Sequence, residues 1–225
     1  MVSTDKAVNP TNVMGCSKRI CEIYVQSLDQ AIKDGKVSGR TQFVTTRFGN
    51  VLGSNGSVIP LFKEQIKRGG PVTVTHKDII RFFMLIPEAC KLVLEAGTMG
   101  NGGEIFVFDM GKPVRIVDLA ERMIRLSGVK GIEIRFTGLR DGEKLYEEVL
   151  NEEETSKPTF HPKIKIAQVR AYDYADANLR IDALVHACAV EGDMQIVKRM
   201  KEIVPEFKSQ HLSLIHISEP TRRRG

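Results

Sequence analysis

Residues 3–18 read Ser-Thr-Asp-Lys-Ala-Val-Asn-Pro-Thr-Asn-Val-Met-Gly-Cys-Ser-Lys, and the rest of the chain is best interpreted outward from them. Two hydroxyls, a carboxylate and an amine come first, at what looks like the end of a strand. Apolar residues at helical spacing then run through residues 13–28. We expect Asn9 to cap this helix, Pro10 to take its first position and residues 34–35 (Asp-Gly) to end it.

Strands and helices are predicted to alternate along the remaining chain. β-Branched and apolar runs bounded by glycine predict strands, and apolar residues three and four apart predict helices. The expected strands are 42–46, 72–75, 104–108, 132–136 and 163–169. The expected helices are 59–67, 87–96, 116–126 with Gly128 as its cap, 144–150, 176–190 and 193–204. This alternation predicts an α/β fold.

The sequence contains no obvious phosphate-binding loop. No predicted strand is followed by G-x-G-x-x-G or G-x-x-G-x-x-G, and no Walker sequence is present. Residues 49–56 do form a glycine-rich loop, in which we expect Gly49, Gly53 and Gly56 to permit positive φ angles. The chain therefore lacks a dinucleotide cradle of its own.

Composition excludes several classes of protein. The 225 residues are 42% hydrophobic and 27% charged, as in an ordinary globular domain. No apolar run approaches the roughly 20 residues of a membrane span. The four cysteines form no C-x-x-C pair, so neither a metal site nor a dithiol is predicted. We expect them to be buried as small apolar side chains in a protein of the reducing cytoplasm.

The last residues differ in character from the rest. Residues 212–222, Leu-Ser-Leu-Ile-His-Ile-Ser-Glu-Pro-Thr-Arg, resemble the translation of a transposase sequencing adapter. We interpret residues 212–225 as a non-native tail and residues 1–211 as native. Without that tail the formal charge falls from +5 to +3, because the tail holds three arginines and one glutamate. The mild basic charge therefore does not indicate a nucleic-acid-binding protein.

Taken singly, the polar residues at the start of the chain are unremarkable. An adjacent pair such as Asp5 and Lys6 is most often a solvated surface pair, and Met14 at an apolar helical position is most often a core residue. Met14 and Lys18 are four residues apart, so they share one face of the predicted helix. Only the order of all these residues together indicates a particular chemistry.

That order, S-T-D-K-A-x-x-P-x-N-x-M-G-x-x-K, resembles the active-site segment of the extended short-chain dehydrogenase/reductases that act on nucleotide sugars. In that superfamily a strand ending in Ser or Thr precedes a helix carrying Y-x-x-x-K. The segment is most similar to the large subgroup of bacterial UDP-N-acetylglucosamine 4,6-dehydratases, in which Met stands in place of Tyr, as Met14 does here. Residues 47–54, 71–76, 81–84 and 138–145 match as well, and the resemblance covers nearly all of residues 1–210.

The resemblance implies a truncated Rossmann-like fold with a smaller α/β substrate-binding region. Residues 1–211 would be the C-terminal part of a catalytic domain, and the N-terminal half that binds most of the NAD would be missing. The implied partners are NAD and a UDP-sugar, with a homo-oligomeric parent protein. Missing N-terminal segments would anchor the parent in the inner membrane with its active site facing the cytoplasm. The chain alone is expected to be inactive.

The implied reaction is a dehydration in bacterial polysaccharide biosynthesis. Hydride leaves sugar C4 for NAD, and the resulting ketone acidifies the proton on C5. A base removes that proton, the C6 hydroxyl leaves as water, and the hydride returns to C6. The product is a UDP-4-keto-6-deoxy-hexosamine.

The resemblance also assigns roles at the reacting sugar. Lys6 would be the base at C5, because neighbouring positive charge favours a neutral amine. Asp5 would protonate the departing hydroxyl, and Thr4 would bond the C4 oxygen. Lys18 and Ser3 would lie on the cofactor side, with Lys18 binding the nicotinamide ribose. The Met14 thioether cannot exchange a proton, so the usual tyrosine role must pass to another group such as Asp5 or a water molecule.

Substrate-binding roles carry over in the same way. Asn50 would contact the diphosphate, Arg140 would offer its planar fork to phosphate, and Glu143 would accept from the ribose hydroxyls. Backbone groups of Val72 and Thr73 would meet uracil, and Arg81 would reach the sugar or the diphosphate. Without the resemblance, Asn50 would be a turn residue, and Arg140 and Glu143 would be a solvated pair.

Two other functions stay open. A nucleotide-sugar 4-epimerase belongs to the same superfamily, but Met14 argues against it because epimerases need the tyrosine, whereas the pair Asp5 and Lys6 favours elimination. The chain could instead be a non-catalytic module that binds a UDP-sugar. Nucleic-acid binding would rest on the net charge alone.

Overall fold

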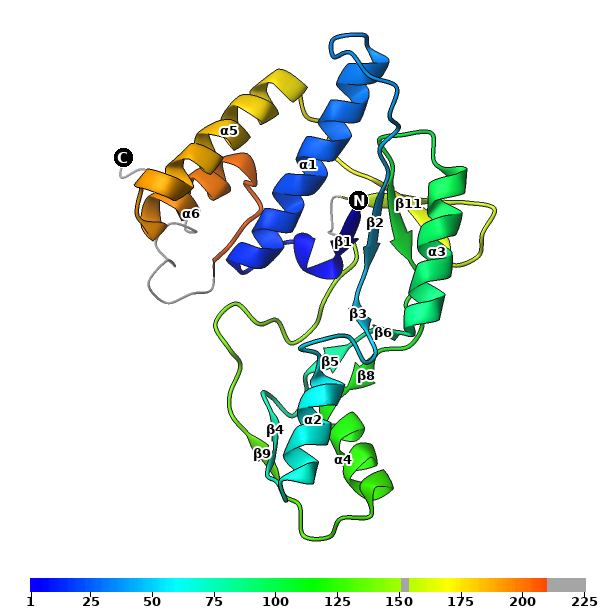
Figure 1. Ribbon diagram of the computed structural model, residues 1–225, viewed down its shortest axis with the longest axis vertical. Coiled ribbons are helices and arrows are strands. Elements are labelled where there is room, and N and C mark those ends of the chain that lie inside the picture. The colour runs from blue at the N-terminus through cyan, green and yellow to red at the C-terminus, as the bar shows by residue number, and fades with distance from the viewer. Residues whose placement is uncertain (151–153, 210–225) are drawn as a thin grey trace, which may run out of the picture.

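The computed structural model describes residues 1–150 and 154–209, so the predicted adapter-derived tail at 212–225 lies outside the described residues. A twisted sheet forms the centre of the larger lobe, with helices on both of its faces (Figure 1). A smaller lobe of short strands and two helices extends from one end of that sheet. The predicted α/β fold is confirmed.

The main sheet has five strands in the order β1-β2-β7-β11-β10. The first three are parallel, and β11 and β10 are antiparallel to their neighbours. Ser3 of β1 is paired with Arg47 of β2, which is in turn paired with Val107 of β7. Among the described residues no strand pairs with the outer edge of β1. The bounds are β1 Val2–Thr4, β2 Thr45–Phe48, β7 Ile105–Phe108, β11 Ile164–Gln168 and β10 Thr155–Pro158.

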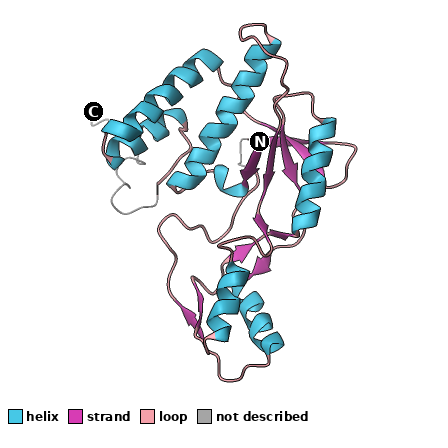
Figure 2. Cartoon of the chain, in the orientation of Figure 1, coloured by secondary structure: helices cyan, strands magenta, loops and turns pink. Residues whose placement is uncertain are grey.

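Helices cover the two faces of this sheet, as Figure 2 shows. Side chains alternate between faces along a strand, so Phe106 and Phe108 pack on α3 (Ile86–Met99), whereas Arg47 and Val107 point to the opposite face. That opposite face is covered by α1 (Val13–Lys33), whose Glu22 is bonded to Arg47. In the described part of the chain, no helix is both long enough and apolar enough to cross a bilayer.

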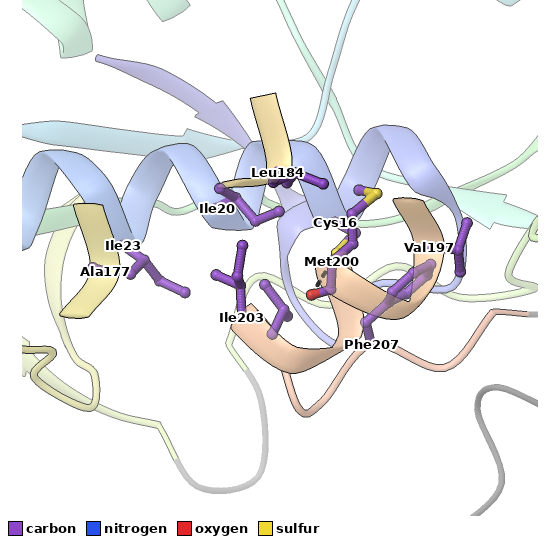
Figure 3. Close-up of a cluster of buried hydrophobic side chains, with 10 residues drawn as sticks. Cys16, Ile20, Ile23, Ala177, Leu184, Val197, Met200, Ile203 and Phe207 are labelled. Atoms are coloured by element: carbon purple, nitrogen blue, oxygen red, sulfur yellow. Dashed lines mark hydrogen bonds between the residues drawn. The ribbon is translucent and has the colours of Figure 1, made fainter. Parts of the chain in front are cut away.

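Three helices form a second core beside the sheet. Apolar side chains of α1 pack against α5 (Tyr174–Val190) and α6 (Asp193–Ile203). Figure 3 shows this cluster, whose buried members are Cys16, Ile20, Ile23, Ala177, Leu184, Val197, Met200, Ile203, Val204 and Phe207. Full burial of one such aliphatic or aromatic side chain contributes about 1.5–3 kcal/mol. The outer helices are therefore held to α1 by apolar packing.

The smaller lobe has its own apolar core. In it, α2 (Val58–Lys67) and α4 (Ile116–Ser127) pack on a parallel pair of strands through Phe62, Val72 and Ala120. Gly128 adopts the left-handed conformation, with φ 71°, and ends α4 as expected. The strands of this lobe and of its junction with the sheet are β3 Asn50–Val51, β4 Val72–Val74, β5 Ile80–Arg81, β6 Phe83–Met84, β8 Val114–Arg115 and β9 Ile134–Phe136.

The predicted helix at 144–150 is wrong, because this segment consists of bends and irregular chain. Its polar groups bond to other parts of the protein. The Leu145 carbonyl accepts from the Ile80 amide at 3.1 Å, and the Lys144 ammonium donates to the Val8 carbonyl at 2.9 Å. These long-range bonds override the local preference of the sequence for a helix.

The start of α1 also differs from the prediction. Asn12 is the cap, and its side-chain oxygen accepts from the Gly15 amide at 2.8 Å. Asn9 has φ 42° and donates instead to the Glu148 carboxylate at 3.1 Å. Asn9 and Asn12 are three residues apart. Because the Asn9 side chain bonds to the distant Glu148, the cap of α1 is Asn12.

Smaller differences concern the cysteines and the element ends. Only Cys16 is buried, and burial raises the pKa of its thiol, whereas Cys21, Cys90 and Cys188 are exposed. The helix predicted at 87–96 continues past Gly97 to Met99. The strand predicted at 42–46 begins and ends later, as β2. The α1 end at Asp34 is as predicted.

A buried network of charges joins α1 to the sheet. Arg47 is fully buried and donates from Nε and Nη2 to the Glu22 carboxylate at 2.8 and 2.7 Å. Its Nη1 donates to Glu154 at 2.7 Å, and Arg19 donates to Glu22 at 3.1 Å. Burial pushes the pKa of Glu22 up, but the bonds and charges of Arg47 and Arg19 outweigh it and hold the pKa below its ordinary value. Glu22 is therefore ionised inside the protein.

Replacing Arg47 by Met is expected to destabilise the chain by about 3–5 kcal/mol, because Glu22 and Glu154 lose their main cation while staying buried. Urea unfolding followed by circular dichroism measures the change in free energy. The control is Arg68→Met, which removes an exposed ion pair with Glu64 and should leave the midpoint almost unchanged. Equal losses of unfolding free energy in Arg47→Met and Arg68→Met would show that the buried network does not account for this stability.

Candidate active site

The polar residues after β1 form a tight turn at the carboxyl end of a parallel strand. Thr4 ends the strand and caps the short 3-10 turn Asp5–Ala7, because its hydroxyl oxygen accepts from the Lys6 amide at 3.4 Å. The same hydroxyl donates to Asp5 Oδ1 at 2.8 Å. Lys6 Nζ donates to Asp5 Oδ1 at 3.0 Å and to Asn50 Oδ1 at 3.2 Å. The structure therefore brings Thr4, Asp5, Lys6 and Asn50 together.

The Asp5 carboxylate is entirely buried, and among the described residues its second oxygen, Oδ2, has no hydrogen-bond partner. Gly49 makes room for it, since a Cβ at that position would lie 2.8 Å from Oδ2. The expected positive φ is confirmed at Gly53 and Gly56, with 79° and 70°, but Gly49 does not have one. Gly49 is required instead by the close approach of its backbone to Asp5.

A second group of charges lies where the smaller lobe meets the sheet. Arg81 is only 7% exposed, and its Nη2 lies 3.5 Å from Glu143 Oε1 and 3.8 Å from Glu147 Oε1. Its Nη1 donates to the carbonyls of Ile80 and Leu145. Two residues predicted to bind substrate, Arg81 and Glu143, are thus brought together and contact each other.

Glu147 is a site residue that the sequence analysis missed. It is 8% exposed, and no residue that the structure describes bonds to its Oε2. Burial raises the pKa of Glu147, the charge of Lys6 lowers it, and the charge of Asp5 raises it further. Glu147 therefore lies within electrostatic reach of the Asp5–Ala7 turn. The sequence predicts a short helix over residues 144–150, and no local signal in it distinguishes Glu147 from its exposed neighbour Glu148.

Three other predicted residues, Ser3, Met14 and Lys18, make no side-chain hydrogen bond to this turn among the described residues. Met14 and Lys18 are exposed, one helical turn apart on α1, and neither side chain bonds to the turn among the described residues. The Ser3 hydroxyl donates to Glu22 at 2.6 Å, inside the charge network. Its donor is therefore used within the protein, and a cofactor role for Ser3 stays a prediction.

The predicted nucleotide contacts are spread over the smaller lobe. Val72 is fully buried in β4, where its amide donates to the Glu133 carbonyl at 2.9 Å. The Thr73 amide donates to the Gln65 side chain at 3.0 Å. Arg140 is exposed, and its amide donates to Glu143 Oε2 at 3.1 Å. Of these three residues, Arg140 alone has an exposed side chain that could bind a phosphate group. The roles of Val72 and Thr73 stay predictions.

A large open cavity adjoins the site without containing the turn. Its volume is about 1260 Å³, and Glu143 and Lys144 are among its lining residues. Asn9, Arg19 and Lys208 line its other side, next to α1 and the end of α6. Because Asp5 and Lys6 do not line it, we place the candidate chemistry at the turn on the basis of its geometry. An amine bonded to a buried carboxylate can exchange a proton with it and with a bound molecule.

The raised pKa of Glu147 predicts how stability depends on pH. Below the ordinary glutamate value of 4.5 both folded and unfolded chains hold this proton, so Glu147→Gln should match the parent chain there. As pH rises through the raised folded pKa, the parent chain must bury a charge and loses stability. Glu147→Gln should therefore have the higher melting temperature at pH 7.

Thermal unfolding from about pH 4 to pH 8 measures this difference. Glu148→Gln is the matched control, since Glu148 is adjacent and exposed, and its effect should not grow with pH. A Glu147→Gln chain that melts below the parent chain at pH 7 would contradict the prediction.

Several known proteins are similar to this chain. It is 53% identical over 201 residues to the capsular polysaccharide biosynthesis protein CapD of Staphylococcus aureus, covering 88% of this chain and 33% of CapD. It is 56% identical over 214 residues to the probable polysaccharide biosynthesis protein EpsC of Bacillus subtilis, covering 94% of this chain and 31% of EpsC. The chain thus spans about a third of the length of these relatives. A UDP-glucose 4-epimerase of Rickettsia rickettsii is 41% identical over 157 residues, covering 70% of this chain and 44% of that protein.

Solved structures agree with the fold. The X-ray structure of Pen from Bacillus thuringiensis superposes with a TM-score of 0.67 at 33% identity, covering 80% of this chain and 60% of Pen. The dTDP-glucose 4,6-dehydratase of Bacillus anthracis, solved in complex with NAD, has a TM-score of 0.53 at 17% identity, covering 67% of this chain and 51% of that one. At that identity the likeness shows the fold alone. The model of the polysaccharide biosynthesis protein family matches residues 1–169, and the chain belongs to that family.

Proposed function

We propose that residues 1–211 act as the C-terminal part of the catalytic domain of an NAD-dependent UDP-N-acetylglucosamine 4,6-dehydratase. The observation that carries the proposal is the bonded pair of Lys6 and buried Asp5 beside a helix that presents Met14. This pair supplies both a base and an acid for elimination, while Met14 supplies no exchangeable proton. The edge of β1 with which no described strand pairs and the greater length of the relatives support a larger domain.

The bond between Lys6 and Asp5 suggests how one pair serves both roles. Transfer of a proton from Lys6 Nζ to Asp5 Oδ1, across 3.0 Å, converts the ion pair into a neutral amine and a carboxylic acid. The amine then removes the proton from sugar C5, and Asp5 donates its proton to the C6 hydroxyl, which leaves as water. Lys6 ends protonated and Asp5 ionised, so the pair returns to its starting charges. Asn50 holds the lysine through its side-chain oxygen.

Lys18 is the described residue that would contact the implied cofactor. Lys18 is exposed one turn from Met14, on the part of α1 that follows the turn, and its ammonium can hold a ribose hydroxyl. Bound NAD would accept the hydride from C4 and return it to C6. A water molecule would take the proton of the C4 hydroxyl, Lys6 would give a proton to C5 as the hydride reaches C6, and the proton held by water would then restore the Lys6 ammonium. Thr4 would orient the C4 oxygen, and Arg140 and Glu143 would hold the UDP. Oligomer formation, membrane anchoring and a cytoplasmic site stay predictions about a longer protein.

A second candidate is a nucleotide-sugar 4-epimerase. The Rickettsia rickettsii relative, which bears the name UDP-glucose 4-epimerase, favours it. Epimerisation needs no acid at C6, so the buried Asp5 would then have no proton to deliver. A non-catalytic UDP-sugar-binding chain is the third candidate, and it would bind UDP without turnover.

A chimera tests these alternatives. Residues 1–209 would replace the matching third of the Staphylococcus aureus CapD relative, and the purified protein would be incubated with UDP-N-acetylglucosamine and NAD. Mass spectrometry should show a product lighter by one water. Lys6→Ala should reduce the rate at least about 10²-fold, because it removes the proposed base.

The exposed lysine Lys36 provides the control, and Lys36→Ala should leave the rate unchanged. A product of unchanged mass with inverted C4 would favour the epimerase. Binding of UDP by calorimetry with no turnover would favour the non-catalytic chain. A Lys6→Ala chimera that dehydrates at the parent rate would rule out Lys6 as the base.

A further inference from the structure

Residues 142–147, called the strap below, link the Asp5–Ala7 turn to the smaller lobe. The strap begins against the start of α1. The Gly142 carbonyl accepts from the Thr11 hydroxyl at 2.8 Å and from the Asn12 side chain at 3.1 Å. A Cβ at Gly142, where φ is 72°, would lie 2.8 Å from the Asn12 Cβ. The strap is thus closely seated on the residues that lead from the turn into α1.

Lys144 contacts the turn itself. Its ammonium donates to the Val8 carbonyl at 2.9 Å. Val8 caps the turn, and its amide donates to the Asp5 carbonyl at 3.1 Å. Val8 therefore links Lys144 to the hydrogen bond that closes the turn, because its carbonyl accepts from Lys144 and its amide donates to Asp5. Burial lowers the pKa of Lys144, whereas the charges of Glu147, Glu148 and Asp5 raise it.

The other side of the strap bonds to the smaller lobe. The Leu145 carbonyl accepts from the Ile80 amide at 3.1 Å and from Arg81 Nη1 at 3.2 Å. Glu143 lies 3.5 Å from Arg81 Nη2. Consecutive strap residues thus hold Arg81 on one side and the Val8 carbonyl on the other. This arrangement sets the distance between the substrate-binding side chains and the catalytic pair.

We propose that Lys144 is a positioning residue. Through its bond to the Val8 carbonyl it fixes the position of Asp5 and Lys6 relative to Arg81 and Glu143. The inference rests on the proposed function, since it assigns Lys144 a part in that same reaction. Lys144 need not touch the sugar. It acts by restricting the turn that presents the acid and the base.

Two replacements of Lys144 distinguish the effect of its hydrogen bond from the effect of its size. Lys144→Met keeps the length of the side chain but removes its donor, so the turn loses its external bond. A displacement of about 1 Å costs on the order of 10²-fold in rate, so kcat of the chimera should fall about 10- to 100-fold with KM changed less than about threefold. Lys144→Arg retains a donor and should restore kcat to within about threefold.

Hydrogen exchange gives a readout that does not depend on turnover. Exchange of the Val8 amide, measured by NMR in the chimera, should become at least about tenfold faster in Lys144→Met and stay slow in Lys144→Arg. Lys112→Met is the control, because Lys112 is exposed and lies in a different loop. It should change neither the exchange of Val8 nor kcat.

The outcomes are separable. A purely structural role would lower the melting temperature and the amount of folded protein but leave kcat per folded molecule unchanged, and that result overturns the proposal. Unchanged Val8 exchange in Lys144→Met overturns it as well. If the parent chimera forms no dehydrated product, the proposed function fails, and the exchange of the Val8 amide alone then supports or overturns the positioning role.

Discussion

The buried charges of Arg47, Glu22 and Glu154 are the interaction on which the arrangement of this chain depends. Arg47 is on β2, between β1 and β7, Glu22 is on the helix that covers the sheet, and Glu154 directly precedes β10. Because a buried ion is costly unless its partners are in place, these three segments are stable only in one relative position. Two residues after Arg47, the chain reaches Gly49 and then Asn50, which contact Asp5 and Lys6. The network thereby also sets the position of the candidate site.

The candidate site lies where open α/β sheets generally bind ligands, outside the carboxyl ends of parallel strands. Thr4 ends β1 there, and β2 continues through Gly49 into the smaller lobe. In the part of the chain that the structure describes, two buried carboxylates, Asp5 and Glu147, each have an oxygen without a hydrogen-bond partner. Such groups are destabilising in an empty fold, and they are typical of sites whose polar atoms are satisfied by a bound molecule. These two carboxylates therefore support the proposal that the chemistry takes place at this turn.

Local patterns predicted the elements whose side chains repeat with a clear period. The helices α2, α4, α5 and α6 end within two residues of their expected bounds, because each has an apolar face that packs on a core. The helix expected at 144–150 failed for the opposite reason. Its polar groups bond to Val8 and Ile80, which are distant in sequence, and no local pattern records such partners. Glu147 was missed because its burial comes from that same long-range packing.

By itself, the sequence determined the α/β class and the polar segment that follows the first strand, since these depend on residue type and spacing. Only the tertiary structure decided which of those residues meet. It paired Lys6 with Asp5 and Asn50, directed Ser3 to Glu22, and placed Lys144 on the Val8 carbonyl. The physical reason is that hydrogen bonds and buried ion pairs need partners at fixed distances, and strand register and helix packing alone set those distances.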